Sequence, residues 1–372
     1  MSASPEFPPA EPRLRHHSEN QSETALAPID EASLVRTQVR DCSFIDGGVL
    51  CDTRDERVSA ALLDGARAAA NIDNTPPGAI ENVVSAPAEI GKTLYDVRRP
   101  LHPNAGLPRD FIGGEVWIGE HRALLADPAT RELIELDATP IPAPEDRVSY
   151  YDDRHLEYWL SGLEDARKLA RWLPAEGVAA RYLDFGGATG RVARHMVRRA
   201  ALDVWLCDIN VNSIAWVDRF FSAPAAAFQN RTIPSLPIAD GYFDLVSALS
   251  VFTHLDQDEI PWLLELRRVI RPGGYLYATV LDEYVWDRLK DPAWEWVLKS
   301  ISRGVHDDTL PERCKHPLTE RVVLEYSSDD ASNVTVFLPR DYLVAKWRRF
   351  FRTIEFFEDQ HIYQTVVVLQ CP

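Results

Sequence analysis

A short acidic and glycine-rich stretch stands out in the 372-residue chain: residues 182–195 read YLDFGGATGRVARH. An apolar pair runs into Asp184, three glycines follow within five positions (Gly186, Gly187 and Gly190), and a basic helix is expected next. A glycine turn between a strand and a helix lets the backbone approach a ligand, and a helix N-terminus favours negative charge. The pattern indicates a nucleotide-like ligand, and a purely structural turn is the alternative.

A second acid follows at the end of the next apolar segment, where DVWLCD closes on Asp208. A carboxylate there can accept both hydroxyls of a ribose, in NAD-binding and in S-adenosylmethionine-binding sheets alike. The middle position of the turn is Ala188, whereas G-x-G-x-x-G has a glycine there so that the backbone can approach a pyrophosphate. S-adenosylmethionine has no pyrophosphate, and Asp184 suits a ligand with an ammonium group. The turn therefore favours a methyl donor.

These acids must be positioned by alternating strands and helices. The strand-like runs are ARYLDF, DVWLCD, FDLVSALS and YLYATVL, and helices are expected from near Gly190, around Ile214 and from about Asp258 to Ile270. Such alternation predicts right-handed crossovers and a parallel sheet covered on both faces. TIEFFE and QTVVVLQ are too close together for a crossover helix, so they should form a hairpin with an antiparallel last strand. Before the sheet, one helix face is predicted at these residues: Leu156, Trp159, Leu160, Leu163, Leu169 and Leu173.

From about residue 150 to 372 the chain resembles a class I S-adenosylmethionine-dependent methyltransferase, within a bacterial group that has SVFTHL after the fourth strand. LDFGGATGR is similar to the first motif of the family and CDIN to its second. IPSLPIADGYFDLVSALSVFTHL, WLLELRRVIRPGGYLYATV and YQTVVVLQ resemble the later motifs and the last strand. The resemblance implies an α/β, Rossmann-like, seven-stranded, mostly parallel sheet with an antiparallel last strand. It also implies S-adenosylmethionine as cofactor and S-adenosylhomocysteine as its product.

The resemblance implies roles for the residues at the ends of the first two strands. The backbone of the turn would line the methionine and ribose portion of the cofactor, through Gly186, Gly187, Ala188 and Gly190. Asp184 would lie near the amino group of the cofactor. Asp208 would hold the ribose hydroxyls, and Ile209 would lie against the adenine.

Further contacts are implied at the next two strand ends. Asn230 and Arg231 stand near the polar contact that the family makes to the adenine amino group, although the usual acid is missing here. Leu249 and Ser250 would border the methionine moiety and the methyl-transfer site.

Methyl transfer requires a nucleophile aligned with a methyl on a sulfonium that is already activated, so the protein mainly positions the reactants and excludes water. A hydroxyl acceptor also needs a base, and His254 in VFTHL is the first candidate. The alternative is that His254 caps or packs the following helix. His361 and Gln364 are poorer candidates. Nothing resembles the carboxylate set of a magnesium-dependent enzyme, so no metal is predicted.

The rest of the chain predicts three divisions: a disordered tail over residues 1–28, an accessory N-terminal domain of unknown role over 29–149, and the methyltransferase domain over 150–372. IPAPED at 141–146 is interpreted as the linker. CSFIDGGVLC at 42–51 predicts a hairpin that places Cys42 opposite Cys51, either as a redox or metal pair or as two core thiols.

Two aromatic segments leave alternatives open. The segment from Asp282 to about Pro339 is longer than a crossover needs, so it forms either a wall and lid of the acceptor pocket or an insertion on the sheet edge. Ahead of the first strand, four aromatic residues could close over the cofactor or belong to the helix core: Tyr150, Tyr151, Tyr158 and Trp159.

Composition narrows the partners. The formal net charge of −17 repels a phosphate backbone, so no nucleic acid is expected. No apolar run approaches the roughly 20 residues of a membrane span, and the N-terminus has no signal-like apolar region, so no membrane insertion and a cytoplasmic location are expected. The expected partner is a small-molecule or sugar acceptor. The competing functions are a non-catalytic S-adenosylmethionine-binding module with a protein-interaction N-terminal domain, and an NAD-dependent dehydrogenase.

Overall fold

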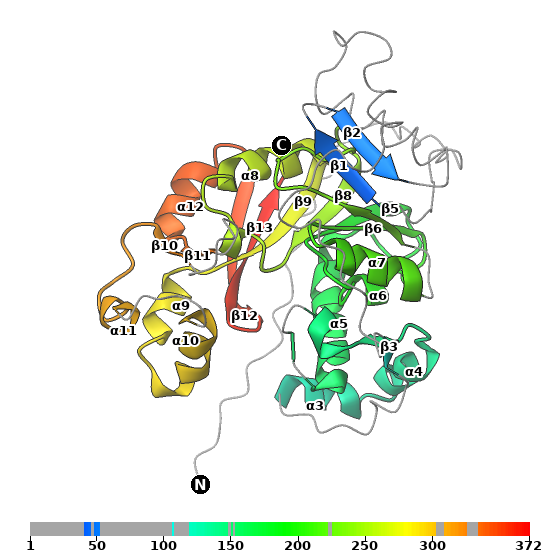
Figure 1. The fold of residues 1–372 in the computed structure, drawn as a ribbon, viewed down its shortest axis with the longest axis horizontal. Helices are drawn as coiled ribbons and strands as arrows, with labels where there is room; N and C mark the ends of the chain where they lie inside the picture. The colour runs from blue at the N-terminus through cyan, green and yellow to red at the C-terminus, as the bar shows by residue number, and fades with distance from the viewer. Residues whose placement is uncertain are drawn as a thin grey trace, which may run out of the picture. The chain divides into compact units, whose positions relative to one another are not determined.

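A computed structural model describes nine stretches of the chain: residues 41–45, 48–52, 106–107, 119–147, 150–151, 153–221, 225–302, 309–325 and 334–372. All of them belong to one compact unit, Val35–Pro372 (Figure 1). The tail expected over residues 1–28 lies outside the described residues.

A seven-stranded sheet is the centre of this unit, with the strand order β12-β13-β9-β8-β5-β6-β7. Its strands are β5 (Ala180–Phe185), β6 (Leu202–Asp208), β7 (Ala226–Gln229), β8 (Phe243–Ala248), β9 (Ile270–Val280), β12 (Thr353–His361) and β13 (Gln364–Gln370). The five strands from β9 to β7 are parallel, and β13 is antiparallel to both β9 and β12. The predicted fold class and the terminal hairpin are confirmed.

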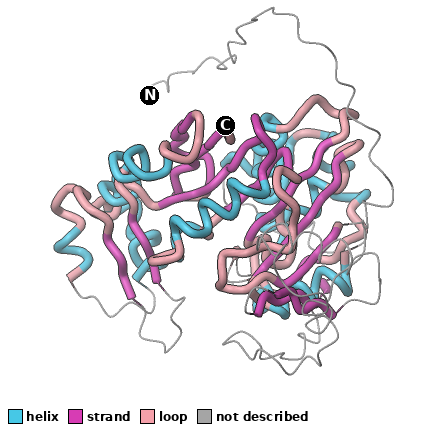
Figure 2. The backbone as a smooth tube through the Cα atoms, turned by 90° about the horizontal axis from the view of Figure 1, so that it is seen from above, coloured by secondary structure: helices cyan, strands magenta, loops and turns pink. Residues whose placement is uncertain are grey.

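Helices cover both faces of the sheet, which explains why its strands are almost continuously buried (Figures 1 and 2). On one face the core contains residues of α5 (His155–Leu169), α6 (Ala193–Met196) and α7 (Val211–Phe220). On the other it contains residues of α8 (Glu259–Val269) and α12 (Arg340–Trp347). The helix predicted before the first strand is α5, continued by the 3-10 helix η5 (Ala170–Trp172).

The strand order reverses at β5, which lies between β6 and β8. The chain winds from β5 to β6 and β7 in one direction, then returns to β8 and β9 on the other side. In open α/β sheets, ligands bind outside the carboxyl ends of the strands at such a switch point. The carboxyl ends of β5, β6 and β8 are the ends that carry the predicted acids and Ser250.

The segment before α5 is packed into the fold. It comprises α3 (Gly119–Ala126), α4 (Pro128–Leu136), the 3-10 helix η4 (Pro144–Asp146) and the short pair β3 (Gly106–Leu107) and β4 (Ile141–Pro142). The interpretation of IPAPED as a linker is wrong, because Ile141 and Ala143 are only 0% and 1% exposed and Ile141 shares a core with α5. The prolines and charged residues of this stretch suggested a loop, but whether a segment is buried depends on its tertiary contacts.

The long segment after β9 has a small core of its own. It contains α9 (Glu283–Arg288), η7 (Pro292–Trp294), α10 (Glu295–Ser302), α11 (Leu310–Arg313) and the antiparallel pair β10 (Val322–Glu325) and β11 (Val334–Phe337). Trp286 is buried there and packs edge-on against Phe337, with the ring centres 4.9 Å apart. The exposed Trp296 instead contacts Tyr363, which lies in the turn between β12 and β13. Their ring centres are 5.7 Å apart. This arrangement agrees with a packed insertion, and a role in an acceptor pocket stays a prediction.

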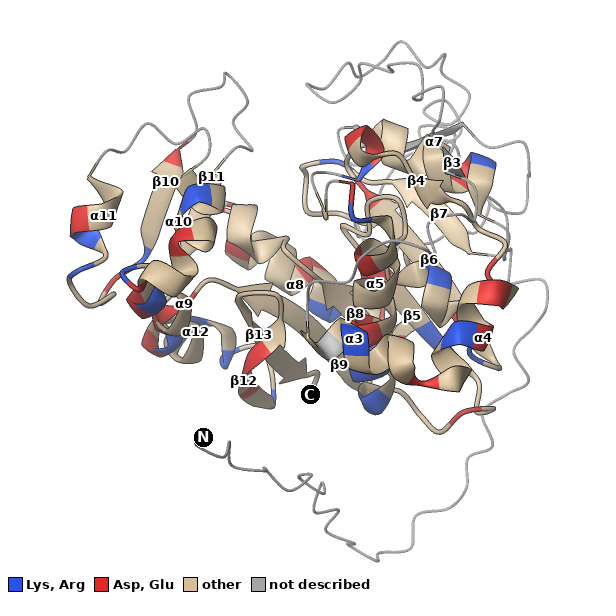
Figure 3. Ribbon diagram, turned by 90° about the horizontal axis from the view of Figure 1, so that it is seen from below, with Lys and Arg blue, Asp and Glu red and all other residues tan. Residues whose placement is uncertain are grey.

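The hairpin predicted near the N-terminus is confirmed as β1 (Asp41–Ile45) and β2 (Gly48–Asp52), with Cys42 opposite Cys51. Its expected turn residues, 46 and 47, lie outside the described residues. Seen from below, basic and acidic residues are mixed along α4, α10 and α11 (Figure 3). Within the described stretches, no helix has the length and apolar character that crossing a bilayer requires.

Candidate cofactor and methyl-transfer site

The turn after β5 has a left-handed backbone at three positions: φ is +74° at Gly186, +46° at Ala188 and +75° at Gly190. Such values cannot continue into an α-helix. The helix predicted from near Gly190 follows the turn, with the Arg194 N–H on the Gly190 carbonyl (3.0 Å), but it is short: α6 spans Ala193–Met196. The turn is held by its own bond from the Gly190 N–H to the Gly187 carbonyl (2.8 Å) rather than by a long helix.

Each glycine of the turn also has a packing reason. A Cβ at Gly186 would lie 2.5 Å from Val251 Cγ2, and one at Gly190 would lie 2.5 Å from the ring of Phe221. At Gly187 a Cβ would lie 2.8 Å from Leu206 and 2.9 Å from the carboxyl carbon of Asp184. The glycines thus allow the turn to fold down onto β6 and onto the acid that ends β5.

Asp184 is buried within a short chain of hydroxyls. Ser247 Oγ donates to Asp184 Oδ1 (3.0 Å), and the Tyr182 hydroxyl lies 2.6 Å from Ser247 Oγ. The other oxygen, Oδ2, is buried and has no hydrogen-bond partner among the described residues. Burial raises the pKa of Asp184 to about 6, against the opposing effects of Ser247 and Arg191. The site therefore offers a buried acceptor atom to a cationic or donor group.

Asp208 ends β6 and is 9% exposed. Its Oδ2 accepts the N–H of Ala188 and its Oδ1 accepts the N–H of Asn210, both at 2.8 Å. Burial raises the pKa of Asp208, while these two N–H groups oppose the rise. The structure thus brings this acid to the middle position of the glycine turn.

The next strand end lies beside Asp208. The Asn230 N–H donates to the Asp208 carbonyl (3.1 Å), and the buried Asn230 side chain donates through Nδ2 to the Arg231 carbonyl (3.2 Å). Asn230 Oδ1 is buried without a partner among the described residues. Ile209 is half-buried, and its carbonyl accepts the side chain of Gln229 at 2.9 Å. Asn230 therefore offers the second buried acceptor in this row of strand ends.

Leu249 and Ser250 follow directly after β8. Leu249 is 8% exposed, and Ser250 has a left-handed φ of +57° with its N–H on Thr279 Oγ1 (2.7 Å). The Ser250 hydroxyl accepts from Tyr150 (2.8 Å) and from Gln364 Nε2 (2.8 Å). Ser250 thus connects the end of β8 to the segment before α5 and to the start of β13.

Sequence reasoning missed a polar stripe on α5 that faces the turn. The Tyr158 hydroxyl lies 3.1 Å from Thr189 Oγ1, Ser161 accepts from Arg191 (3.1 Å), and Asp165 forms an ion pair with Arg191 (2.8 Å). Positions 158, 161 and 165 share one helix face, since residues three, four and seven apart do so. That spacing of polar residues within an apolar helix was the available signal.

The four aromatic residues ahead of β5 have different surroundings, and a role in closing over the cofactor stays a prediction. The hydroxyls of Tyr150 and Tyr158 contact Ser250 and the turn. Trp159 is core: it is 0% exposed and donates to Asp137 (2.8 Å). Tyr151 is buried in the same core as Trp159, and burial raises its pKa to about 12.

His254 lies in the 3-10 helix η6 (Phe252–His254), and its Nδ1 is 2.7 Å from the Val334 carbonyl of β11. A carbonyl only accepts, so Nδ1 carries the hydrogen. The N-cap of the following helix, α8, is Asp258 rather than His254. Desolvation lowers the pKa of His254, while its hydrogen bond to the Val334 carbonyl opposes the shift. Its role as base stays a prediction.

His361 and Gln364, the poorer candidates, both lie near Ser250. They are partners across the β12–β13 hairpin, and Gln364 contacts Ser250 directly. His361 is 1% exposed and pairs with Asp165 at 3.1 Å. The hairpin is therefore joined to the end of β8 through Gln364 and to α5 through His361.

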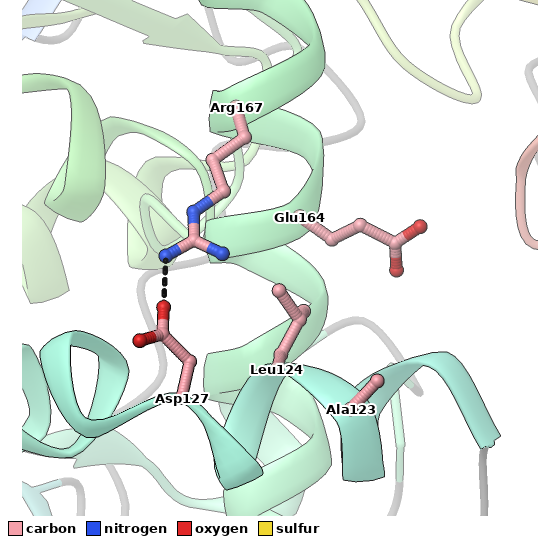
Figure 4. A pocket seen from close by; sticks show the side chains of 5 residues that line it. All are labelled: Ala123, Leu124, Asp127, Glu164 and Arg167. Atoms are coloured by element: carbon pink, nitrogen blue, oxygen red, sulfur yellow. Dashed lines mark ion pairs between the residues drawn. The ribbon is translucent and has the colours of Figure 1, made fainter. Parts of the chain in front are cut away.

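A pocket of about 340 Å³ lies away from this edge of the sheet, between α3 and α5 (Figure 4). It includes the ion pair of Arg167 with Asp127 (3.5 Å), but it contains none of the predicted cofactor residues. Within the described stretches, no group of three or more His, Cys, Asp or Glu residues could hold a metal ion.

Comparison with known proteins finds a match to a family model over part of the chain. Residues 183–278, from the end of β5 to the end of β9, match the model of a methyltransferase domain. An uncharacterized methyltransferase of Schizosaccharomyces pombe is 41% identical over 56 residues, which are 15% of this chain and 20% of that protein. The matched segment spans about a fifth of the length of this relative.

Solved structures with a similar chain path include two methyltransferases. A protein from Methanosarcina mazei described as S-adenosylmethionine-dependent is 18% identical, over 55% of this chain and 96% of that one, with a TM-score of 0.38. The 1,6-didemethyltoxoflavin-N1-methyltransferase of Burkholderia thailandensis, with bound 1,6-didemethyltoxoflavin and S-adenosylhomocysteine, is 13% identical over 69% and 92% of the chains, with a TM-score of 0.39. Likeness at this level carries no argument about function. The domain match is more specific: residues 183–278 resemble a methyltransferase domain, which supports S-adenosylmethionine as the cofactor.

Proposed function

We propose that this chain transfers a methyl group from S-adenosylmethionine to an oxygen or nitrogen of a small-molecule or glycosidic acceptor. The observation that carries the proposal is the unpartnered, buried Oδ2 of Asp184 at the glycine turn. Buried polar atoms are normally satisfied, so this oxygen favours a ligand that supplies a donor or a positive charge. S-adenosylmethionine has an ammonium group for that place, and NAD has none.

The other strand ends fit the rest of the cofactor. Asp208 would hold the ribose hydroxyls, with Ile209 beside the adenine, and the unpartnered Oδ1 of Asn230 suits the adenine amino group, which is a donor. The turn backbone would line the methionine and ribose portion, with Arg231 and Leu249 in the surrounding shell. When bound, the cofactor supplies an activated methyl group on a sulfonium.

The chain's own residues would then position the acceptor at Ser250 and accept its proton. Two imidazoles are available to accept that proton. One is His254, which the motif suggested, and the other is His361, which lies opposite Gln364, the residue that contacts Ser250. The acceptor itself is not specified by these contacts, because one fold supports many substrates.

The test is calorimetric titration of the full chain with S-adenosylhomocysteine, S-adenosylmethionine and NAD. We expect micromolar binding of the two sulfur compounds and none of NAD. The opposite preference would support the dehydrogenase, and binding of neither compound by folded protein would refute the cofactor site. If the cofactor binds but labelled methyl reaches no acceptor in a broad screen, a non-catalytic binding module is favoured.

A further inference from the structure

A buried imidazole nitrogen without a partner lies beside the candidate methyl-transfer site. His361, the last residue of β12, is 1% exposed, and its Nε2 has no hydrogen-bond partner among the described residues. Its Nδ1 lies 3.2 Å from Oδ1 and 3.1 Å from Oδ2 of Asp165 on α5. Polar atoms buried in this way normally find a partner, so Nε2 is available to a group that the unliganded chain does not provide.

The contacts of Asp165 determine which ring nitrogen holds the hydrogen. Burial opposes the charge on Asp165, but the hydrogen bond from His361 and the charges of Arg191 and Lys168 lower the pKa of this carboxyl, so it is ionised at neutral pH. An ionised carboxylate only accepts, and Nδ1 must therefore be the donor. A neutral His361 then has its lone pair on Nε2. A carboxylate that orients an imidazole in this tautomer is the arrangement that prepares histidine to take a proton.

The β12–β13 hairpin places His361 opposite the residue that contacts Ser250. His361 and Gln364 are directly opposite each other, so their side chains lie on the same face of the sheet with Cβ atoms about 5 Å apart. Gln364 Nε2 donates to Ser250 Oγ at 2.8 Å. One side chain therefore separates His361 from the end of β8.

A second path leads from the same pair back to Ser250. Asp165 pairs with Arg191 (2.8 Å), and the guanidinium of Arg191 lies 5.1 Å from the ring centre of Tyr150. The Tyr150 hydroxyl donates to Ser250 Oγ (2.8 Å). The two paths close a ring of six side chains at the switch point of the sheet: Ser250, Gln364, His361, Asp165, Arg191 and Tyr150.

We propose that His361 is the base that removes the proton of the methyl acceptor, with Asp165 as its positioning residue. This inference rests on the proposed function. The acceptor atom forms a bond to the methyl carbon, the methyl–sulfur bond breaks with its electron pair remaining on sulfur, and the acceptor's proton passes to His361 Nε2. The imidazolium is stabilised by Asp165. The substrate class is therefore an acceptor that carries a proton, a hydroxyl or an N–H group.

Other charged and titratable groups surround the pair from every neighbouring element. Arg191 and Lys168 supply positive charge next to Asp165. Tyr151, before α5, Tyr182, on β5, and Tyr277, on β9, interact electrostatically with Asp165, and burial raises the pKa of all three. The carboxylate of Glu164 on α5 also interacts with Asp165, and it pairs with Lys168 at 2.7 Å. The two cations keep Asp165 ionised, and no second carboxylate is in contact with the imidazole among the described residues.

The first test reads the tautomer and needs no acceptor. The full chain is labelled with ¹⁵N-histidine, and long-range ¹⁵N–¹H correlation is recorded at pH 7.5 with and without S-adenosylhomocysteine. We expect a neutral His361 ring with the hydrogen on Nδ1, and His361→Gln identifies its signals. His195 is the internal reference of opposite tautomer, since its Nε2 faces the Trp159 carbonyl at 3.0 Å. A His361 ring that is doubly protonated, or protonated on Nε2, would overturn the proposal.

The second test measures function. Phenol, catechol, methyl glucoside and imidazole are offered with labelled S-adenosylmethionine. In His361→Gln we expect S-adenosylhomocysteine affinity within about twofold of wild type, kcat lowered about 100-fold or more, and the acidic limb of the pH profile lost. The exposed His316→Gln is the matched control and should change neither quantity.

The outcomes separate this proposal from the one on which it rests. Loss of kcat in His254→Gln but not in His361→Gln would assign the base to His254 and overturn the inference. Failure of the wild-type chain to bind S-adenosylhomocysteine would count against the cofactor site instead. If the cofactor binds but none of the four probes is methylated, the tautomer alone decides.

Discussion

The backbone N–H of Ala188 donates a 2.8 Å hydrogen bond to Asp208 Oδ2, which fastens the turn after β5 to the end of β6. Ala188 has a φ of +46°, so a residue with a Cβ is held in the left-handed region by the acid of the neighbouring strand. The other oxygen of Asp208 accepts the Asn210 N–H at 2.8 Å. The two strand ends thus form one unit on which the candidate cofactor contacts are built.

Replacing Asp208 tests whether this unit binds the cofactor. We expect Asp208→Ala to weaken S-adenosylhomocysteine binding by roughly 1.5–3 kcal/mol, as for a charged hydrogen bond, measured by calorimetry. Asp244→Ala is the control. This acid lies at the amino end of β8, on the opposite edge from the cofactor site, where it accepts from the Arg181 N–H and the Arg271 side chain. Unchanged affinity in a folded Asp208→Ala protein would place the site elsewhere.

Ala188→Gly should stabilise the fold. A left-handed backbone strains an L-residue with a Cβ but does not strain glycine, so the free energy of unfolding should rise by about 0.5–1 kcal/mol in urea denaturation. Ala193→Gly in α6 is the matched variant of opposite sign, since that backbone is helical and glycine weakens a helix by about 1 kcal/mol. A destabilised Ala188→Gly protein would show that the turn conformation is wrong.

The affinity for the cofactor should depend on pH through Asp184. Its pKa is about 6, so protonation below that value removes the charge that the ammonium group requires. We expect constant S-adenosylhomocysteine affinity between pH 7 and 8, then a loss that approaches about tenfold per unit below pH 6, absent in Asp184→Asn.

The titration of Asp184 would not unfold the protein, so the loss of cofactor affinity at low pH can be distinguished from unfolding. The folded-state pKa of Asp184 lies above its ordinary value of 3.8, so its burial penalises folding most at neutral pH. That penalty shrinks as the pH falls from about 6 to 3.8, and protein stability measured alongside should not decline on account of this group. A pH-independent affinity would argue against contact between Asp184 and the ammonium group.

Asp137 should be a determinant of stability rather than of binding. It is 3% exposed, accepts from Trp159 (2.8 Å) and Arg194 (2.9 Å), and joins the segment before α5 to α6. Asp137→Ala leaves a buried guanidinium without its partner, so we expect a loss of about 3–5 kcal/mol in urea denaturation, with a smaller loss for Asp137→Asn. Unchanged stability would mean that this ion pair is not formed.

From the pKa of Asp137 we also expect a loss of protein stability at acid pH. Despite the opposing effect of burial, Arg194 and Trp159 lower the pKa of Asp137 from 3.8 to about 2. Its contribution is therefore fully present above the unfolded value and lost as the pH falls toward about 2. The wild-type chain should lose stability over that interval more steeply than Asp137→Asn.

Local patterns were sufficient for the order of strands and helices and for the acids that end β5 and β6, because apolar runs and glycine turns act over a few residues. Local patterns failed where tertiary contacts decide the structure of a segment. The stretch at 141–146 has the composition of a linker but is buried against α5, and the helix after the turn is only four residues long.

A Rossmann-like sheet, a glycine turn that tolerates an alanine, and two acids at adjacent strand ends could all be predicted from local patterns of residues. The polar ring of Asp165, Arg191, Ser250 and His361 could not, because these residues lie far apart in the chain and no local spacing relates them. They meet because crossovers and the terminal hairpin bring the ends of separate strands to one edge, where α5 covers them.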